Sequence, residues 1–258
     1  MSNSTTLLKG KKVLVIGGSS GKSDIYIACI GRSIATASLS NGASVVIASS
    51  SQAKVDKAIE LLKKNIMGNA DVTVTGEAFD MNDFAALRSF LTKKALLDYF
   101  VTTTGGPPRG LGSPPSADVD LREHMKDSME YLAILSDFEC WKNLIRPGGS
   151  ITITTGSLQK RPILGAGFGL GPAGAIETAT RSLAVDLKPL RINSIAPGLA
   201  DIEMVQAFSD ELRKPMLETF SQTSLVGHVG TPDEVAEAYY VNITGQVIIV
   251  DGGGGVLV

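Results

Sequence analysis

Short apolar runs alternate with longer amphipathic segments along the chain. The runs are rich in β-branched residues and are mostly apolar at successive positions, as strands covered by helices on both faces require. The expected strands are Lys12–Ile16, Ser44–Ala48, Val72–Thr75, Tyr99–Thr103, Ser150–Thr154, Ile192–Ala196 and Gln246–Val250. The expected helices between them are Arg32–Ser40, Gln52–Ile66, Asn82–Lys94, Val119–Ile145, Ala173–Leu187 and Pro232–Tyr240.

This alternation predicts an α/β protein with one doubly wound, Rossmann-type domain. It indicates about seven parallel strands joined by right-handed crossovers, with helices on both faces of the sheet. The sequence shows neither a linker-like low-complexity stretch nor an internal repeat. Residues 1–258 are therefore expected to form a single domain.

Two of the expected helices carry apolar residues at helical spacing. The residues with this spacing are Met125, Met129, Leu132, Leu135, Phe138 and Trp141 in the first, and Ile176, Leu183 and Leu187 in the second. The simplest interpretation is that these faces pack on the sheet. A further apolar face that pairs with a second subunit would give the same pattern.

The composition excludes several classes of protein. Of the 258 residues 43% are hydrophobic, 19% are charged and the net charge is −2, without a basic block for nucleic acid or an anionic membrane. Met1–Lys9 lacks an apolar signal core, and no run is long enough to span a bilayer. Cys29 and Cys140 form no disulfide or metal pattern, and His124 and His228 are isolated. We expect a cytoplasmic protein without a metal site.

A glycine cluster follows the first strand. It reads Gly17-Gly18-Ser19-Ser20-Gly21, and Ile30-Gly31-Arg32 then opens a helix. A dinucleotide needs glycine where the chain bends and the backbone approaches the pyrophosphate, and the helix supplies free N–H groups. A purely structural turn is the alternative. The position after a buried strand at the start of a βα series favours nucleotide binding.

This turn resembles that of the short-chain dehydrogenase/reductase superfamily, which reads T/G-G-x-x-x-G-I-G. The segment Lys22–Cys29 divides the motif here, and its removal would leave a continuous match. The insertion lengthens the phosphate loop, bulges outward or reflects an unspliced fragment. The resemblance implies that the phosphates meet these residues: Gly17, Ser19, Ser20, Gly21, Ile30 and Gly31.

The resemblance extends over nearly the whole chain. It implies that Asp80, after the third strand, contacts adenine, and that Thr103, Thr104 and Gly105 support the adenosine side. The segment Arg191-Ile-Asn-Ser-Ile-Ala-Pro-Gly198 is similar to the one that lines the nicotinamide, which implies contacts from Pro197, Gly198 and Leu199. Gly245–Gly253 resembles the family's last strand.

The end of the second strand bears on the choice of nucleotide. Family members that bind NAD usually carry a carboxylate there for the ribose hydroxyls. This chain has Ser49 and Ser50 instead, with Lys54 shortly after, so a 2′-phosphate would meet donors and no repulsion. An ordinary helix start with serine as N-cap is the alternative. We expect NADP(H) in preference to NAD(H).

The catalytic positions depart from the family pattern. The resemblance implies a Ser, a Tyr, a Lys and an Asn, but the first three positions fall on Gly156, Gly169 and Ala173, and the Asn position falls near Ser128. A positioned general acid contributes roughly 10²–10⁴-fold to the rate. A cationic substrate such as an iminium needs no proton when it receives hydride, so its reduction survives this loss.

An atypical branch of the superfamily shares these departures. It includes fungal bifunctional reductase/Diels–Alderases, which carry a T-x-x-G-x-x-x-R-P segment, a Gly/Ala-rich helix start and a Pro-Pro motif. Thr155–Pro162, Gly165–Gly171 and Gly105–Arg109 are similar to these three features. Arg109 stands where those enzymes have an acidic residue, which argues against transferring their mechanism.

Three residues are candidates for contact with substrate. They are Tyr131, Ser157 and Arg109. The alternatives are a tyrosine packed in the core, a serine that bonds to backbone in a turn, and a solvated loop arginine. Asp201 and Glu203 could pair with a cationic substrate or simply start a helix.

Three functions remain open at this point. The first is an NADPH-dependent reductase of an imine, iminium or conjugated acceptor in secondary metabolism. The second is a non-redox isomerase or cyclase that retains NADP, and the third is an inactive nucleotide-binding homologue. In each case we expect a small-molecule ligand, and the resemblance implies a homodimer or homotetramer.

Overall fold

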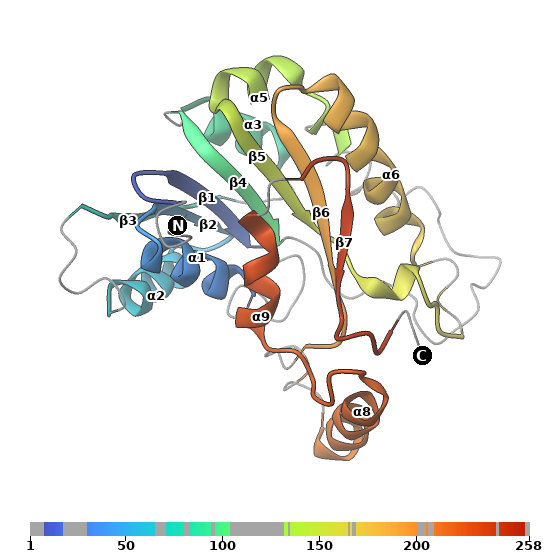
Figure 1. Cartoon of the computed structure of the whole chain (residues 1–258). Coiled ribbons are helices and arrows are strands. Elements are labelled where there is room, and N and C mark those ends of the chain that lie inside the picture. The colour runs from blue at the N-terminus through green and yellow to red at the C-terminus, as the bar shows by residue number, and fades with distance from the viewer. Residues whose placement is uncertain are drawn as a thin grey trace, which may run out of the picture.

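Seven parallel strands form one sheet in the computed structural model (Figure 1). The structure describes residues 8–17, 30–64, 71–79, 83–93, 96–103, 132–133, 135–164, 166, 169–200, 205, 209–240 and 243–255. The strands are β1 (Lys12–Gly17), β2 (Ser44–Ser49), β3 (Val74–Ala78), β4 (Leu97–Thr103), β5 (Ile145–Thr154), β6 (Arg191–Pro197) and β7 (Val247–Val250). Their order is β3-β2-β1-β4-β5-β6-β7, which confirms the predicted Rossmann-type α/β fold.

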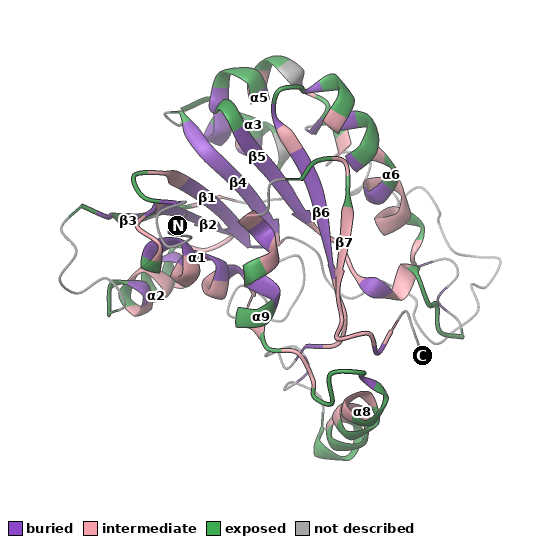
Figure 2. Cartoon of the chain, in the orientation of Figure 1, coloured by how far each residue is buried: buried purple, intermediate pink, exposed green. Residues whose placement is uncertain are grey.

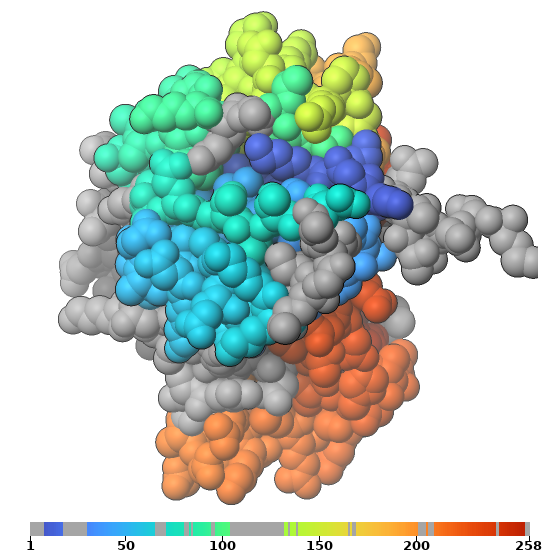
Figure 3. All heavy atoms as spheres, turned by 90° about the vertical axis from the view of Figure 1, so that its left-hand side faces the viewer, coloured from blue at the N-terminus to red at the C-terminus, as the bar shows by residue number. Residues whose placement is uncertain are grey.

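Helices cover both faces of the sheet. One face carries α1 (Ile30–Ser40), α2 (Gln52–Lys63) and α9 (Pro232–Glu237); the other carries α3 (Phe84–Lys93), α5 (Phe138–Leu144) and α6 (Gly171–Asp186). Helix α8 (Asp210–Thr223) lies below the carboxyl ends of the strands in Figure 1 and forms the base of the molecule in Figure 3. The described residues also include two short 3₁₀ helices, η3 (Ser157–Gln159) and η4 (Ala238–Tyr240).

Alternate residues of each central strand enter two separate cores. In β1, Val13 and Val15 face the α1 layer, whereas Leu14 and Ile16 face the α5 layer. Figure 2 shows this as a buried sheet between helices whose outer sides are exposed. Each such side chain contributes roughly 1.5–3 kcal/mol when it is fully buried. The two-sided burial explains why the strand sequences are continuously apolar.

The amino end of the sheet is closed by a buried carboxylate. Asp98 in β4 pairs with Lys11 Nζ at 3.2 Å and with Arg146 Nη1 at 2.7 Å, and it accepts the backbone N–H of Lys12 at 2.9 Å. These contacts join the beginnings of β1, β4 and β5. In open parallel sheets ligands bind at the opposite, carboxyl end of the strands.

The third strand lies further along the chain than predicted. It was expected at Val72–Thr75 and runs instead over Val74–Ala78, through Gly76. A β-carbon on Gly76 would lie 2.4 Å from Val55 Cγ1 of α2. Glycine, which reads as a strand breaker in sequence, is used here to let a helix pack closely on the strand.

The predicted helix Val119–Ile145 is wrong at its carboxyl end. Asp137 caps α5 by accepting the Cys140 N–H, which starts a new helix at Phe138. Ile145 already belongs to β5 and pairs with Leu97. Leu135 and Trp141 are nevertheless buried against the sheet, as the helical spacing predicted.

Helix α8 was not predicted. Pro215 lies inside it, and none of its residues is buried, so the sequence shows a helix breaker without an apolar stripe. The expected helix Pro232–Tyr240 is also divided, because η4 follows α9 at Ala238.

Candidate functional site

The strand order reverses between β1 and β4. Chain connections run outward from β1 to β2 and β3 on one side, and from β4 to β7 on the other. In open parallel sheets such a switch point leaves a crevice at the carboxyl ends of the strands, where ligands bind. Gly17 and Thr103, both predicted from the sequence, are the last register partners of β1 and β4 at this point.

Gly31 lets α1 approach the switch point closely. A β-carbon there would lie 3.1 Å from Thr103 Oγ1, and the Thr103 hydroxyl itself donates to the Ile16 carbonyl at 3.4 Å. Ile30 is the first residue of α1, so the N–H groups of the helix's first turn lie next to Gly31. Three predicted residues, Gly17, Gly31 and Thr103, are thus brought together.

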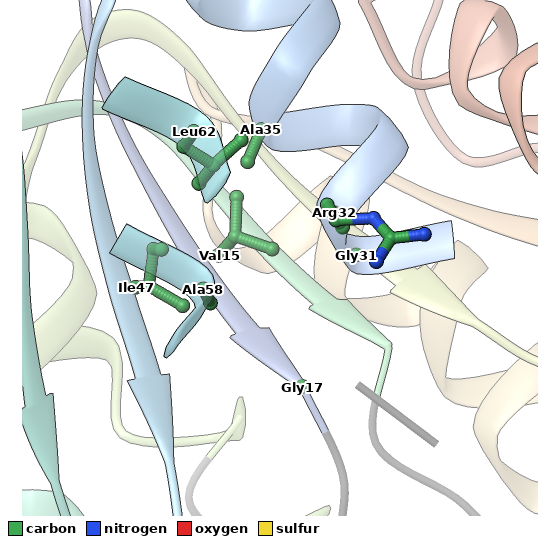
Figure 4. A pocket seen from close by; sticks show the side chains of 8 residues that line it. All are labelled: Val15, Gly17, Gly31, Arg32, Ala35, Ile47, Ala58 and Leu62. Carbon is green, nitrogen blue, oxygen red and sulfur yellow. The ribbon is translucent and has the colours of Figure 1, made fainter. Parts of the chain in front are cut away.

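A small crevice lies beside these residues, between β1, β2, α1 and α2. It is lined by Val15, Gly17, Gly31, Arg32, Ala35, Ile47, Ala58 and Leu62. Figure 4 shows the Arg32 guanidinium directed away from Ile47, and the Val15 and Leu62 side chains filling the inner part. Apart from Arg32, the residues that line it are apolar or glycine.

The end of β2 carries three consecutive serines with different roles. Ser51 caps α2 and accepts the Lys54 N–H at 3.4 Å, so the N-cap interpretation is correct for this residue. Ser49 is fully buried, and its hydroxyl has no hydrogen-bond partner among the described residues. A buried hydroxyl without a partner is costly. It fits a site that is completed by a polar ligand.

The end of β6 packs against the turn that follows β7. Pro197 is the register partner of Val250, and the Gly198 N–H donates to the Val250 carbonyl at 2.9 Å. A β-carbon on Gly198 would lie 2.5 Å from Asp251 Cβ. Leu199 follows as a half-buried residue.

The Asp251 carboxylate orders the last turn. It accepts the N–H groups of Gly253 at 2.8 Å and Gly255 at 3.0 Å. Ser157, just after β5, is 8% exposed, and its hydroxyl would be 3.5 Å from a β-carbon on Gly255. Ser157 and Gly198 therefore converge on one turn, Asp251–Gly255.

The end of β5 is held by hydroxyl groups. Tyr239 donates to Thr154 Oγ1 at 2.6 Å, and Thr154 donates to the Thr102 carbonyl at 2.8 Å. Burial raises the pKa of the Tyr239 hydroxyl well above its usual value, so it stays neutral. These two consecutive hydrogen bonds fix the ends of β4 and β5 relative to each other.

One ion pair near the carboxyl end of β5 was not predicted. Lys160 Nζ lies 2.7 Å from Glu177 Oε2, and Glu177 is 5% exposed. Its second oxygen, Oε1, is buried without a partner in the described part of the chain. The two residues lie in a loop and on a helix face 17 positions apart, so neither periodicity nor a motif brings them together.

Several predicted positions lie outside the described residues. They are Ser19, Ser20, Gly21, the insertion Lys22–Cys29, Asp80, Thr104, Gly105, Arg109, Tyr131, Asp201 and Glu203. Ser50 and Lys54 are described at the start of α2. Within the described ranges, no group of three or more His, Cys, Asp or Glu side chains could hold a metal ion. No helix in those ranges is long and apolar enough to cross a membrane.

The sequence as a whole matches known proteins. The profile of the SDR-like Rossmann domain matches residues 5–257. The short-chain dehydrogenase/reductase ATR9 of Stachybotrys chlorohalonatus is 30% identical over 95% of this chain and 97% of its own length. The short-chain dehydrogenase/reductase malC of Malbranchea aurantiaca is 29% identical, with 97% and 96% of the two chains covered.

The fold also matches solved structures over almost its full length. The structure of the MalC reductase/Diels-Alderase from Malbranchea aurantiaca superposes with a TM-score of 0.78. The match covers 98% of this chain and 99% of that one, at 26% sequence identity.

Proposed function

This chain belongs to the short-chain dehydrogenase/reductase family, and from this premise we propose that it is an NADP(H)-dependent reductase of an imine, iminium or conjugated acceptor. As a member of this family it is an oxidoreductase that acts on a small molecule, and the family fold implies a nicotinamide cofactor. The proposal adds the identity of the cofactor, the class of acceptor and a place in secondary metabolism. We also propose that the protein assembles as a homodimer or homotetramer. A molecular mass in solution equal to that of one chain would contradict this assembly.

The observation that carries the proposal is the switch point with its glycines. Gly17 and Thr103 end β1 and β4 at the switch point, and Gly31 brings the start of α1 against Thr103; the N–H groups of a helix start attract anions such as a pyrophosphate. The buried Ser49 hydroxyl, which lacks a partner among the described residues, lies at the end of β2, where the family holds the adenosine ribose. The residues present therefore fit a dinucleotide.

The proposed preference for NADP(H) follows from charge. The hydroxyls of Ser49 and Ser50 lie at the end of β2, and Lys54 lies in the first turn of α2. Ser51 is engaged as the N-cap. A carboxylate at this point would repel a 2′-phosphate, whereas hydroxyl and ammonium groups donate to it.

The proposed class of acceptor follows from the residues before and inside α6. Aligned on the family pattern, the tyrosine and lysine positions fall on Gly169 and Ala173, and neither side chain can donate a proton. When bound, NADPH supplies the hydride. An iminium carbon accepts it without proton transfer, so the chain has only to bind and orient the substrate. Ser157 can donate a hydrogen bond there, and Tyr131 and Arg109 remain proposed contacts.

Turnover with matched acceptors tests this function. The purified protein is mixed with NADPH and a cyclic N-alkyl iminium, an α,β-unsaturated ketone or a saturated ketone, and the loss of NADPH absorbance is followed. We expect kcat/KM for the iminium to exceed that for the saturated ketone by about 10²-fold or more, because only the ketone needs the missing general acid. Equal rates, or no oxidation with any acceptor, would contradict the proposal.

A second candidate function is cycloaddition with the cofactor retained. The similarity to the MalC reductase/Diels-Alderase over nearly the whole chain favours it. A second assay, with NADP⁺ and a reactive diene and dienophile, distinguishes the two, because a cyclase forms its product there and leaves the redox state of the nucleotide unchanged.

A further inference from the structure

The segment after β5 leads into the substrate side of the proposed site. The Thr155 N–H donates to the Ile195 carbonyl at 2.7 Å, and the chain then forms η3. The Lys160 N–H closes this turn on the Ser157 carbonyl at 2.8 Å. The next residues, Arg161 to Leu164, are exposed. Lys160 is therefore the residue at which the segment after β5 becomes exposed to solvent.

A side-chain contact ties this point to α6. Lys160 Nζ reaches Glu177 Oε2 at 2.7 Å, and 37% of the Lys160 side chain is exposed, against 7% for Glu177. The carboxylate comes from the α6 face that is turned to the sheet, since Thr180, one turn further, bonds to Ser194 of β6. The pair thus connects a solvent-facing loop to the inner side of a helix.

Stability alone does not account for this arrangement. An ion pair with one buried partner must offset the desolvation of that partner, and apolar side chains of similar volume often stabilise as well or better. The Glu177 carboxylate is also only half satisfied within the described structure, because Oε1 has no donor. The ion pair does, however, fix the position of Lys160 and therefore of the turn that contains Ser157.

We propose that Glu177, acting through Lys160, is a positioning residue that holds Ser157 against the Asp251–Gly255 turn and so sets the geometry of the substrate side. This inference rests on the proposed function, in which Ser157 contacts the acceptor. Ser157 is the first residue of η3 and its carbonyl accepts the Lys160 N–H, so a displacement of Lys160 shifts the Ser157 backbone as well. A misplacement of about 1 Å at such a contact is enough to reduce turnover strongly.

Four variants and one control test the proposal. Lys160→Met leaves a buried carboxylate without its partner and lowers Tm. Glu177→Leu removes the anchor. The double variant Lys160→Met/Glu177→Leu replaces the whole pair with apolar side chains and is expected to recover Tm towards that of the parent protein. Lys160→Arg keeps the ion pair. Lys64→Met is the control, because it breaks the exposed pair with Glu60 on α2.

Two readouts separate positioning from stability. With NADPH and the cyclic iminium, we expect kcat/KM for the iminium to fall about tenfold in both single variants and in the double variant. KM for NADPH should stay unchanged, and Lys160→Arg and Lys64→Met should match the parent. In the NADP⁺ complex, hydrogen exchange of the Lys160 amide should accelerate in the same three variants.

The outcomes decide the proposal independently of the proposed function. A double variant that recovers Tm, kcat/KM and amide protection together would overturn it, since the pair would then be purely structural. If the parent protein oxidises no NADPH with any acceptor, the proposed function fails by itself. The exchange measurement then decides alone, and unchanged protection of the Lys160 amide in Lys160→Met overturns the inference.

Discussion

At the scale of single residues, Gly198 shows how one missing side chain shapes the packing of β6 against the last turn. Its N–H bonds to Val250, and its α-carbon lies against Asp251, the residue that orders the last turn. The contact is with a backbone atom and a β-carbon, so neither neighbour can rotate away. A larger residue would have to separate β6 from the end of β7.

Gly198→Ala should therefore destabilise the protein. The added β-carbon would meet Asp251 Cβ at 2.5 Å and Cα at 2.9 Å. We expect a loss of about 1–3 kcal/mol in the free energy of unfolding, measured by urea denaturation. Gly174→Ala is the matched control, because a β-carbon there meets nothing within 4 Å in α6. That change should stabilise by about 0.5–1 kcal/mol. Equal effects of the two substitutions would contradict this interpretation.

Individual site residues were predictable where a motif names them. Gly17, Gly31 and Thr103 were predicted to contact the nucleotide and meet at the switch point, whereas Gly198, predicted to line the nicotinamide, packs against Asp251. The Lys160–Glu177 pair was missed because charged residues in a loop and in a helix carry no pairing signal in one sequence. Tertiary packing alone brings them together.

At the scale of elements, the loop between α8 and α9 is held by a histidine with two acceptors. His228 Nδ1 lies 3.2 Å from the Val226 carbonyl and Nε2 lies 2.9 Å from Glu234 Oε1. A carbonyl and a carboxylate can only accept, so both ring nitrogens must carry a proton. These hydrogen bonds raise the pKa of His228.

The stability contributed by His228 should fall as the pH rises. Because its folded pKa is raised, the contribution is complete below the ordinary imidazole pKa of about 6.5 and is lost as the pH passes through the raised value. The Tm difference between the parent and His228→Gln should be larger at about pH 5.5 than at about pH 8.5. A difference that is constant or grows with pH would show that the imidazolium is not the bound form.

Glu234 determines how the stability of the same loop depends on pH in the acid range. Hydrogen bonds from the Thr231 N–H, His228 and the Thr231 hydroxyl lower its pKa to about 2. Its contribution is complete above the ordinary value of 4.5 and is lost as the pH falls towards 2. The comparison at about pH 5.5 therefore lies where Glu234 remains ionised.

Element boundaries were harder to predict than the elements themselves. All seven predicted strands are present, but β5 begins at Ile145 instead of Ser150, and β3 is shifted because Gly76 serves close packing with Val55. The missed helix α8 has no buried residue, so no apolar stripe could reveal it. Local patterns report burial, and elements that bury little or use glycine for contact escape them.

At the scale of the whole molecule, the alternation of strands and helices was sufficient to predict the sheet. Parallel strands need crossovers, and right-handed crossovers on both faces lead to the observed order with a switch point between β1 and β4. The position of the candidate site follows from that order. The acceptor does not, because it depends on side chains at loop positions that the topology leaves free.

The central claim is that the turn after β1 and the end of β2 together hold NADP(H). It is tested most directly by calorimetric titration of the protein with NADPH and with NADH. A variant lacking Lys22–Cys29 examines the divided turn, and Ser50→Asp places a carboxylate at the end of β2. We predict that NADPH binds at least about tenfold more tightly than NADH, and that Ser50→Asp abolishes this preference by repelling the 2′-phosphate. Binding of neither nucleotide, or equal affinity for both in the unsubstituted protein, would contradict the account.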